Sequence, residues 1–205
     1  ARGIYMTGSS YYNILNNNFH ITNTHTGQSI GVPMYLTSNP SLKVYNNNFS
    51  NAGVGYGIYA NNNTSFLADY NNYYVLGSQI GYWNGTARTT LSDWQSSTGQ
   101  DLNAIEINPQ FMSDSDLHVS NVLLNGAGLF QALVTQDIDG ESRQNPPDIG
   151  ADEFDPSIAN DAGVFMAVGP HAPFAHGSQP IDIAIKNFGA DTLTSVNVRW
   201  VVNGI

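Results

Sequence analysis

The sequence predicts an all-β protein whose residues 1–154 form a right-handed parallel β-helix (a solenoid) with a C-terminal cap. Three observations predict it: a repeated unit of constant length, apolar residues in register two positions apart, and paired asparagines at one place in every unit. The units start 30 and then 24 residues apart, yet their internal spacing does not change. In each unit an asparagine lies 13 positions after a tyrosine: Asn18 after Tyr5, Asn48 after Tyr35, and Asn72 after Tyr59.

The strands of the repeat follow from its apolar columns. Apolar residues two positions apart lie on one face of a strand, so we expect them to point inward. Each unit then supplies two short strands, and stacking places every strand about 4.8 Å from its counterpart in the next unit. The four predicted columns are Ile4, Met34 and Ile58; Met6, Leu36 and Ala60; Tyr12, Leu42 and Phe66; and Ile14, Val44 and Ala68.

Asparagines follow the second strand of every unit. Asparagine satisfies backbone groups in a tight bend, tolerates left-handed backbone angles, and can hydrogen-bond to the same amide in the next unit. A polar low-complexity loop would not place them in register with apolar columns. We therefore predict a structural ladder with two rows: Asn17, Asn47 and Asn71, and Asn18, Asn48 and Asn72.

Residues 75–154 lack the repeat, and we expect them to cover the open end of the stack, where unpaired backbone groups would promote aggregation. Within them, Thr90 is a predicted N-cap and Gly99 a predicted helix terminator. The segment between them predicts a helix of at most two turns that buries Leu91 and Trp94.

Several segments of this region, in this order, resemble the C-terminal end of parallel β-helix repeat proteins of the choice-of-anchor type. Proteins of this type are exported bacterial proteins, often attached to the surface, so the resemblance implies fold and export, and it implies no activity. The segments that carry it are Leu91-Ser92-Asp93-Trp94, Thr98-Gly99-Gln100-Asp101, Asn108-Pro109-Gln110-Phe111, Asp116-Leu117-His118-Val119, Asp137-Ile138-Asp139-Gly140 and Asp148-Ile149-Gly150-Ala151.

Residues 155–205 do not follow the repeat pattern. They contain a predicted strand at 164–168 and alternating apolar residues at 181–185 and 196–202. The stretch from Ile185-Lys186-Asn187-Phe188-Gly189 to Val202-Asn203-Gly204 looks like the first strands of the immunoglobulin-like modules that follow such helices in Bacteroidetes surface proteins. A complete sandwich needs about seven strands in about 100 residues. We therefore expect an incomplete immunoglobulin-like β-sandwich here, and a chain that is a fragment of a longer protein.

Composition limits the partners. Sixteen acidic and six basic residues give a net charge of −10, which disfavours nucleic-acid phosphates and anionic membranes. The chain has no cysteine and no long apolar run, so we expect no disulfide, no thiolate metal site and no membrane insertion. Glycans or cell-surface components are the expected partners, in an extracellular setting, secreted or on the cell surface.

Catalytic groups of the kind used by polysaccharide-acting enzymes are scattered. Lyases on this fold use a Lys or Arg base, often with calcium, but Arg2, Lys43, Arg88 and Arg143 form no basic cluster in the sequence. For Arg143 an ion pair with Asp139 or Asp148 is the simpler explanation. Hydrolases need two or three carboxylates at set separations, and Asp69 stands alone among the repeats. The catalytic residues of this segment are therefore unknown.

Two further groups of residues could bind a ligand. Asp137 and Asp139 have part of the spacing of a calcium loop, but the remaining ligands are missing, so we predict a structural turn and no cofactor, with calcium as the alternative. His20 and His25 fall in the extra residues between the first two units, where a loop on a rigid scaffold could bind a ligand or simply be solvated.

Outward tyrosines are the best functional clue. If Ile4 and its counterparts point inward, then Tyr5, Tyr35 and Tyr59 point outward at the stacking interval. Such a ladder suits sugar rings, which have an apolar face and many hydroxyls. Stabilisation of strand pairing alone is the simpler explanation of the same ladder.

We therefore predict a non-catalytic module, a rigid rod that binds glycans or serves in adhesion. The alternative is the C-terminal part of a polysaccharide lyase or glycoside hydrolase whose catalytic coils lie upstream.

Overall fold

The computed structural model is predominantly β and divides into two compact units, Ala1–Phe154 and Asp155–Ile205. None of the helices among the described residues is long and apolar enough to cross a membrane. The structure describes residues 1–8, 10–22, 31–38, 41–61, 66–77, 79–155, 161–169, 177, 180–189 and 192–199.

Each repeat unit contributes three strands, where the sequence predicted two. The third strand has only four residues and starts at the second asparagine of each pair, so it looked like part of the bend. The strands are β1 (Arg2–Thr7), β2 (Ser10–Leu15) and β3 (Asn18–Ile21); β4 (Val32–Thr37), β5 (Ser41–Tyr45) and β6 (Asn48–Asn51); and β7 (Ile58–Asn61), β8 (Phe66–Asp69) and β9 (Asn72–Val75).

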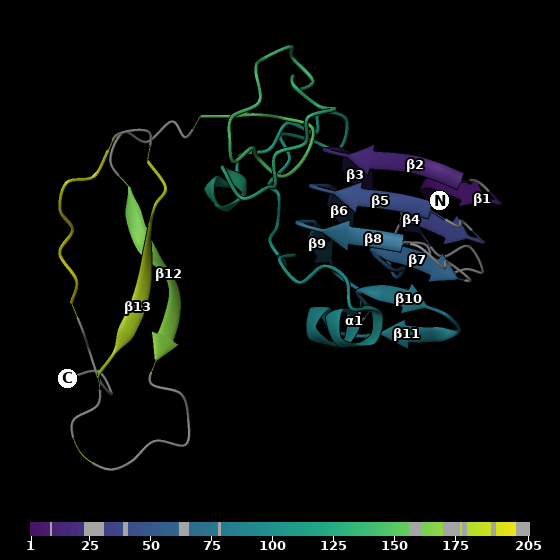
Figure 1. Cartoon of the computed structure of the whole chain (residues 1–205), viewed down its shortest axis with the longest axis horizontal. Coiled ribbons are helices and arrows are strands. Elements are labelled where there is room, and N and C mark those ends of the chain that lie inside the picture. The colour runs from purple at the N-terminus through teal and green to yellow at the C-terminus, as the bar shows by residue number, and fades with distance from the viewer. Residues whose placement is uncertain are drawn as a thin grey trace. The chain divides into compact units, whose positions relative to one another are not determined.

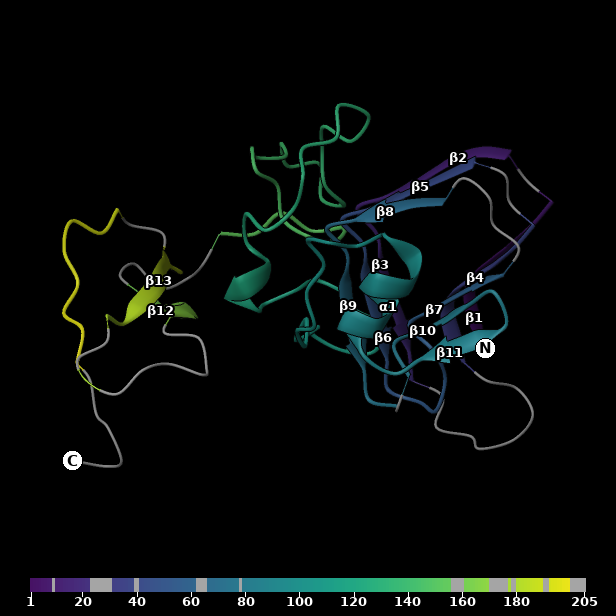
Figure 2. The same ribbon diagram turned by 60° about the horizontal axis from the view of Figure 1, so that its bottom comes forward.

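Every strand pairs in parallel with its counterpart in the next unit, which gives three sheets in the orders β1-β4-β7, β2-β5-β8 and β3-β6-β9. Figure 2 shows the three sheets on three sides of a common interior. One cluster of buried apolar side chains fills that interior and draws on all three sheets, with Met34, Leu42 and Phe49 each at most 1% exposed.

The predicted columns are confirmed in register. Ile4 pairs with Met34 and Met34 with Ile58, and the other three columns pair in the same way. Tyr12 is the exception to the predicted burial, because it pairs with Leu42 but remains 49% exposed. It lies on β2, an edge strand of its sheet, directly after an irregularity in the register between Ser10 and Tyr12.

The first row of the asparagine ladder is confirmed and runs in one direction. The Asn17 side-chain amide donates to Asn47 Oδ1 at 2.9 Å, and the Asn47 amide donates to Asn71 Oδ1 at 3.0 Å. The Asn71 amide donates to Asp101 Oδ1 at 2.7 Å, so the row ends on a carboxylate, which only accepts. The left-handed backbone angle belongs to the residue before each ladder asparagine, for example Asn46 with φ 57°.

The second row runs the opposite way and holds a distant segment. The Asn72 amide donates to Asn48 Oδ1 at 2.9 Å, and the Asn48 amide donates to Asn18 Oδ1 at 2.7 Å. The same three amides also donate to backbone carbonyls of the region after the repeats. Those carbonyls belong to Ile107, Leu117 and Ile149.

The end of the stack is covered by a hairpin and a helix. Strand β10 (Gly81–Trp83) pairs in parallel with β7 and antiparallel with β11 (Thr86–Arg88), and α1 (Leu91–Thr98) follows (Figure 1). The predicted helix is confirmed, because Thr90 accepts from the Asp93 backbone N–H and Gly99 ends the helix in a left-handed conformation.

The rest of the predicted cover lies elsewhere. Residues 102–154 have little regular structure beyond a 3-10 turn, η1 (Val122–Leu124), and they run along the side of the stack instead of across its end. They bury a small apolar cluster of their own around Leu124 and Ile149. Asn46 also holds them, because its side chain donates to the Leu129 carbonyl and accepts from the Leu129 N–H.

We expect Gly81→Ala to lower the unfolding free energy of the compact unit Ala1–Phe154 by about 1–3 kcal/mol, because overpacking a closely filled core has that cost. A Cβ at position 81 would lie 2.5 Å from a ring carbon of Trp94, which is 0% exposed. Denaturant unfolding would measure the change. Thr86→Ala, an exposed position of the same hairpin, is the control; equal stability of the two variants would contradict the prediction.

In the compact unit Asp155–Ile205, two of the three expected strands are present. Strand β12 (Ala162–Gly169) pairs antiparallel with β13 (Asp182–Asn187). The third predicted strand is not seen in its described part, because residues 192–199 form no strand. Its remaining residues, 200–202, lie outside the described residues.

Candidate functional site

The predicted tyrosine ladder forms a continuous stack and includes one ring that the sequence analysis missed. Tyr5 and Tyr35 have ring centroids 5.4 Å apart, and Tyr35 and Tyr59 lie 4.2 Å apart with nearly parallel rings. Tyr82 on β10 extends the row, 4.4 Å from Tyr59 and parallel to it. We call these four residues the tyrosine stack.

The faces of the inner rings in the stack are covered. Tyr59 lies between Tyr35 and Tyr82, and the guanidinium carbon of Arg2 lies 4.1 Å from the Tyr35 ring centroid and 4.6 Å from that of Tyr5. Burial, together with hydroxyl hydrogen bonding to Tyr35, raises the pKa of Tyr59 to about 12. The stack therefore offers ring edges and phenol hydroxyls to a ligand, rather than open faces.

His20 lies in strand β3 and not in the connecting segment where the sequence analysis placed it. Its Nδ1 is 2.8 Å from Ser50 Oγ, its Nε2 is 3.4 Å from Asp114 Oδ1, and its ring packs edge-on against Phe111. These residues line a pocket of about 220 Å³. Ser50 is 1% exposed, and its contact with His20 joins strands β3 and β6. His25 lies outside the described residues.

Asp137 is fully used in holding its own loop. Its Oδ1 accepts from the backbone N–H groups of Asp139 and Glu141, and its Oδ2 accepts from that of Glu153. This is the structural turn that the sequence analysis favoured over calcium. Asp139 is different, because its carboxylate contacts His118 Nε2.

Arg143 pairs with neither Asp139 nor Asp148, and the predicted partners are wrong. It forms a buried ion pair with Glu153 at 3.1 Å and donates to the backbone carbonyls of Asp152 and Gly150. Burial raises the pKa of Asp148 to about 7, although the backbone N–H groups of Phe154 and Gly126 donate to its carboxylate. Arg143 and Asp148 thus hold a segment that lacks regular secondary structure.

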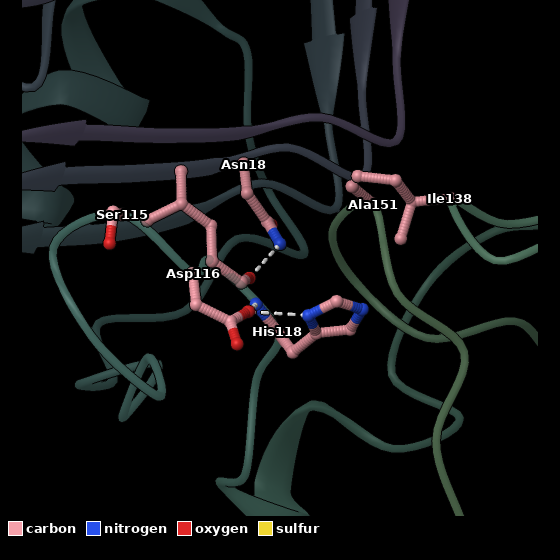
Figure 3. Close-up of a pocket in the computed structure, with 7 residues that line it drawn as sticks. Asn18, Ser115, Asp116, His118, Ile138 and Ala151 are labelled. Carbon is pink, nitrogen blue, oxygen red and sulfur yellow. Dashed lines mark hydrogen bonds and ion pairs between the residues drawn. The ribbon is translucent and has the colours of Figure 1, made fainter.

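His118 lies at the wall of a pocket of about 450 Å³, where the irregular segment meets the asparagine ladder. Its Nδ1 contacts Asp116 Oδ1 at 2.5 Å, and its Nε2 lies 2.9 Å from Asp139 Oδ2. Figure 3 shows Asp116 beside the His118 ring, with Asn18 and Ile138 above the ring in this view. The Asn18 amide donates to the Leu117 carbonyl at 2.7 Å.

Two carboxylates that accept hydrogen bonds from the ring favour its protonated form. The hydrogen bonds that the imidazole donates to Asp116 and then to Asp139 raise the pKa of His118 to about 9, and the hydrogen bond from His118 lowers the pKa of Asp116. No role was predicted for His118, although its segment is one of those that carry the family resemblance. The signal was the alternation of Asp116 and His118, which places an acid two residues before a histidine.

Comparison with protein families, curated proteins and solved structures gives no match to this chain. The resemblance to choice-of-anchor β-helix proteins therefore remains a prediction from the quoted segments.

Proposed function

We propose that residues 1–154 are the end of a right-handed parallel β-helix of the choice-of-anchor type, exported to the cell surface or secreted. Parallel sheets in register and a buried asparagine ladder support this proposal. We further propose that residues 155–205 begin an immunoglobulin-like module, for which the antiparallel pair of β12 and β13 is the supporting feature.

The proposed role is that of a non-catalytic rod that binds neutral glycans along the tyrosine stack. The observation that supports it is the row of tyrosines on one sheet, spaced by one repeat and outside the apolar core. Tyrosine combines a large apolar ring with a hydroxyl that donates and accepts hydrogen bonds. A row of them provides both the apolar and the polar contacts that a sugar chain needs.

The binding mode follows from the covered ring faces. A glycan would lie across the stack, so that its C–H groups contact ring edges and its hydroxyls bond to the phenol oxygens. We therefore expect removal of the hydroxyls alone to weaken binding, whereas a platform of open rings would tolerate their loss.

The test is retention of the 205-residue chain on immobilised neutral glycans. We expect the variant Tyr5→Phe, Tyr35→Phe, Tyr59→Phe to keep its fold and lose about tenfold in affinity, since hydrogen bonds of about 0.5–1.5 kcal/mol each are removed. Replacing the same three residues by serine should abolish retention.

The matched control changes Tyr11 and Tyr12 to serine. Both are exposed tyrosines outside the stack, 87% and 49% exposed, and we expect retention to be unchanged. If the serine variant of the stack is retained as well as the unmodified chain, or if the unmodified chain is retained on no glycan, the tyrosine stack serves strand pairing alone and the proposal fails.

A further inference from the structure

Five of the six acidic side chains of residues 137–153, all except Glu141, divide into two groups by what their oxygens do. Asp137, Asp148 and Glu153 each use both carboxylate oxygens to accept hydrogen bonds that hold the local backbone. Asp139 accepts no backbone N–H from the described residues, and Asp152 accepts one, from Val119 at 3.1 Å through Oδ2. The loop structure therefore does not account for Asp139, and only in part for Asp152.

These two carboxylates meet the His118 ring. One ligand atom each of His118, Asp139 and Asp152 lies within 4.8 Å of the other two. Asp152 is 5% exposed and held by its backbone bond, so one arm of the group is fixed. Asp139, whose side chain is 57% exposed, is free to adjust.

Asp116 gives the group a second feature. It contacts Nδ1 of His118, whereas Asp139 contacts the other ring nitrogen, Nε2. A carboxylate on one imidazole nitrogen sets the tautomer and orients the other nitrogen toward a metal, an arrangement common to histidine ligands. Here the oriented nitrogen, Nε2, points at Asp139.

We propose that His118, Asp139 and Asp152 bind a divalent transition metal of the zinc class, with Asp116 as a positioning residue. Imidazole with carboxylates suits zinc and its neighbours, whereas calcium takes six to eight oxygens. The site thus differs in ligands and in metal from the calcium alternative at Asp137 and Asp139. Three protein ligands leave a tetrahedral metal one position for water or an external ligand.

Binding needs only a small contraction of the site. Zinc–ligand bonds of about 2.0–2.2 Å place ligand atoms of a tetrahedral site roughly 3.3 Å apart. His118 and Asp139 already satisfy this at 2.9 Å. Rotation of the exposed Asp139 side chain and a shift of the His118 ring toward Asp152 would complete the contraction.

The experiment titrates the 205-residue chain, stripped of metal with a chelator, with zinc chloride and separately with calcium chloride by calorimetry. We expect one zinc ion per chain and no saturable calcium binding. His118→Gln and Asp139→Asn should each weaken zinc binding about 100-fold, and Asp116→Asn about 10–100-fold, the range for partners that orient a ligand.

His20→Gln and Asp114→Asn are matched controls, because they alter a histidine and an acid that contact each other in a different pocket. Zinc binding should be unchanged in both. X-ray absorption of the zinc complex should show one imidazole ligand, and it should lose that signal in His118→Gln. Absence of stoichiometric zinc binding, binding that His118→Gln and Asp139→Asn leave intact, or calcium binding in place of zinc would each overturn the proposal.

Discussion

Replacing Asn47 by alanine is expected to lower the unfolding free energy of the compact unit Ala1–Phe154 by about 3 kcal/mol. Each buried donor or acceptor left without a partner costs about 1–3 kcal/mol. Asn47 is 0% exposed, and its oxygen accepts from both the backbone and the side chain of Asn17. Its amide donates to Asn71 and to the carbonyl of Ile14. Alanine removes all of these bonds from the middle of the row.

Asn17→Ala is the matched control for this prediction. Asn17 occupies the same column at the start of the row and is only partly buried, so we expect a loss of about 1 kcal/mol. Urea unfolding followed by tryptophan fluorescence would measure both variants, because Trp94 lies in the core. Equal losses would mean that the amide row adds nothing beyond each local bend.

Asp101→Ala is expected to have a similar or larger effect, at least about 3 kcal/mol, because three buried donors lose their acceptor together. The Tyr73 hydroxyl and Trp94 Nε1 both donate to Oδ2 at 2.8 Å, and the Asn71 amide donates to Oδ1. The backbone at Asp101 is also left-handed, with φ 56°, which alanine tolerates less well than aspartate.

Asp101 also predicts how stability depends on pH. Burial raises its pKa from 3.8 to about 6, against the hydrogen bonds from Asn71, Trp94 and Tyr73 that lower it. The folded state therefore holds a proton that the unfolded state has released between about pH 4 and 6. This contribution is fully present below about pH 4 and is lost as pH rises through 6, a change of about 3 kcal/mol for two pKa units.

Asp101→Asn separates this effect from the rest of the protein. Asparagine cannot titrate and tolerates the left-handed backbone, so the difference in unfolding free energy between the unmodified chain and this variant should change by about 3 kcal/mol across that pH range. Chemical unfolding at pH 4, 5, 6 and 7 measures it. A constant difference would show that Asp101 does not titrate there.

The sequence predicted the parallel sheets well, because apolar residues at period two and identical asparagines one unit apart directly report a stacked register. The register of the columns that contain Met34 and Val44 could be predicted for this reason. The third strand was missed because four residues such as Asn48–Asn51 carry too short a pattern. The path of residues 102–154 could not be predicted from the sequence. Asn18 and Asn48 hold this segment through backbone carbonyls, which every residue has, so no residue type marks the contact points.

The candidate sites were predictable to different degrees. The tyrosine positions follow from the repeat, but Tyr82 joins them through β10, which lies outside it. His118, Asp139 and Asp152 meet in a segment without regular structure, so no periodicity relates them. Only the folded path of the chain brings them together.

The one-way row of side-chain amides has a consequence for how such a protein can change length during evolution. Each interior asparagine receives a bond from one neighbour and gives one to the next, so a duplicated or deleted unit would leave the row continuous. Only the final acceptor, Asp101, occupies a position that cannot be exchanged with the others. Gain or loss of whole units is therefore the least disruptive change in size, whereas a change near Asp101 disturbs the single place where the row stops.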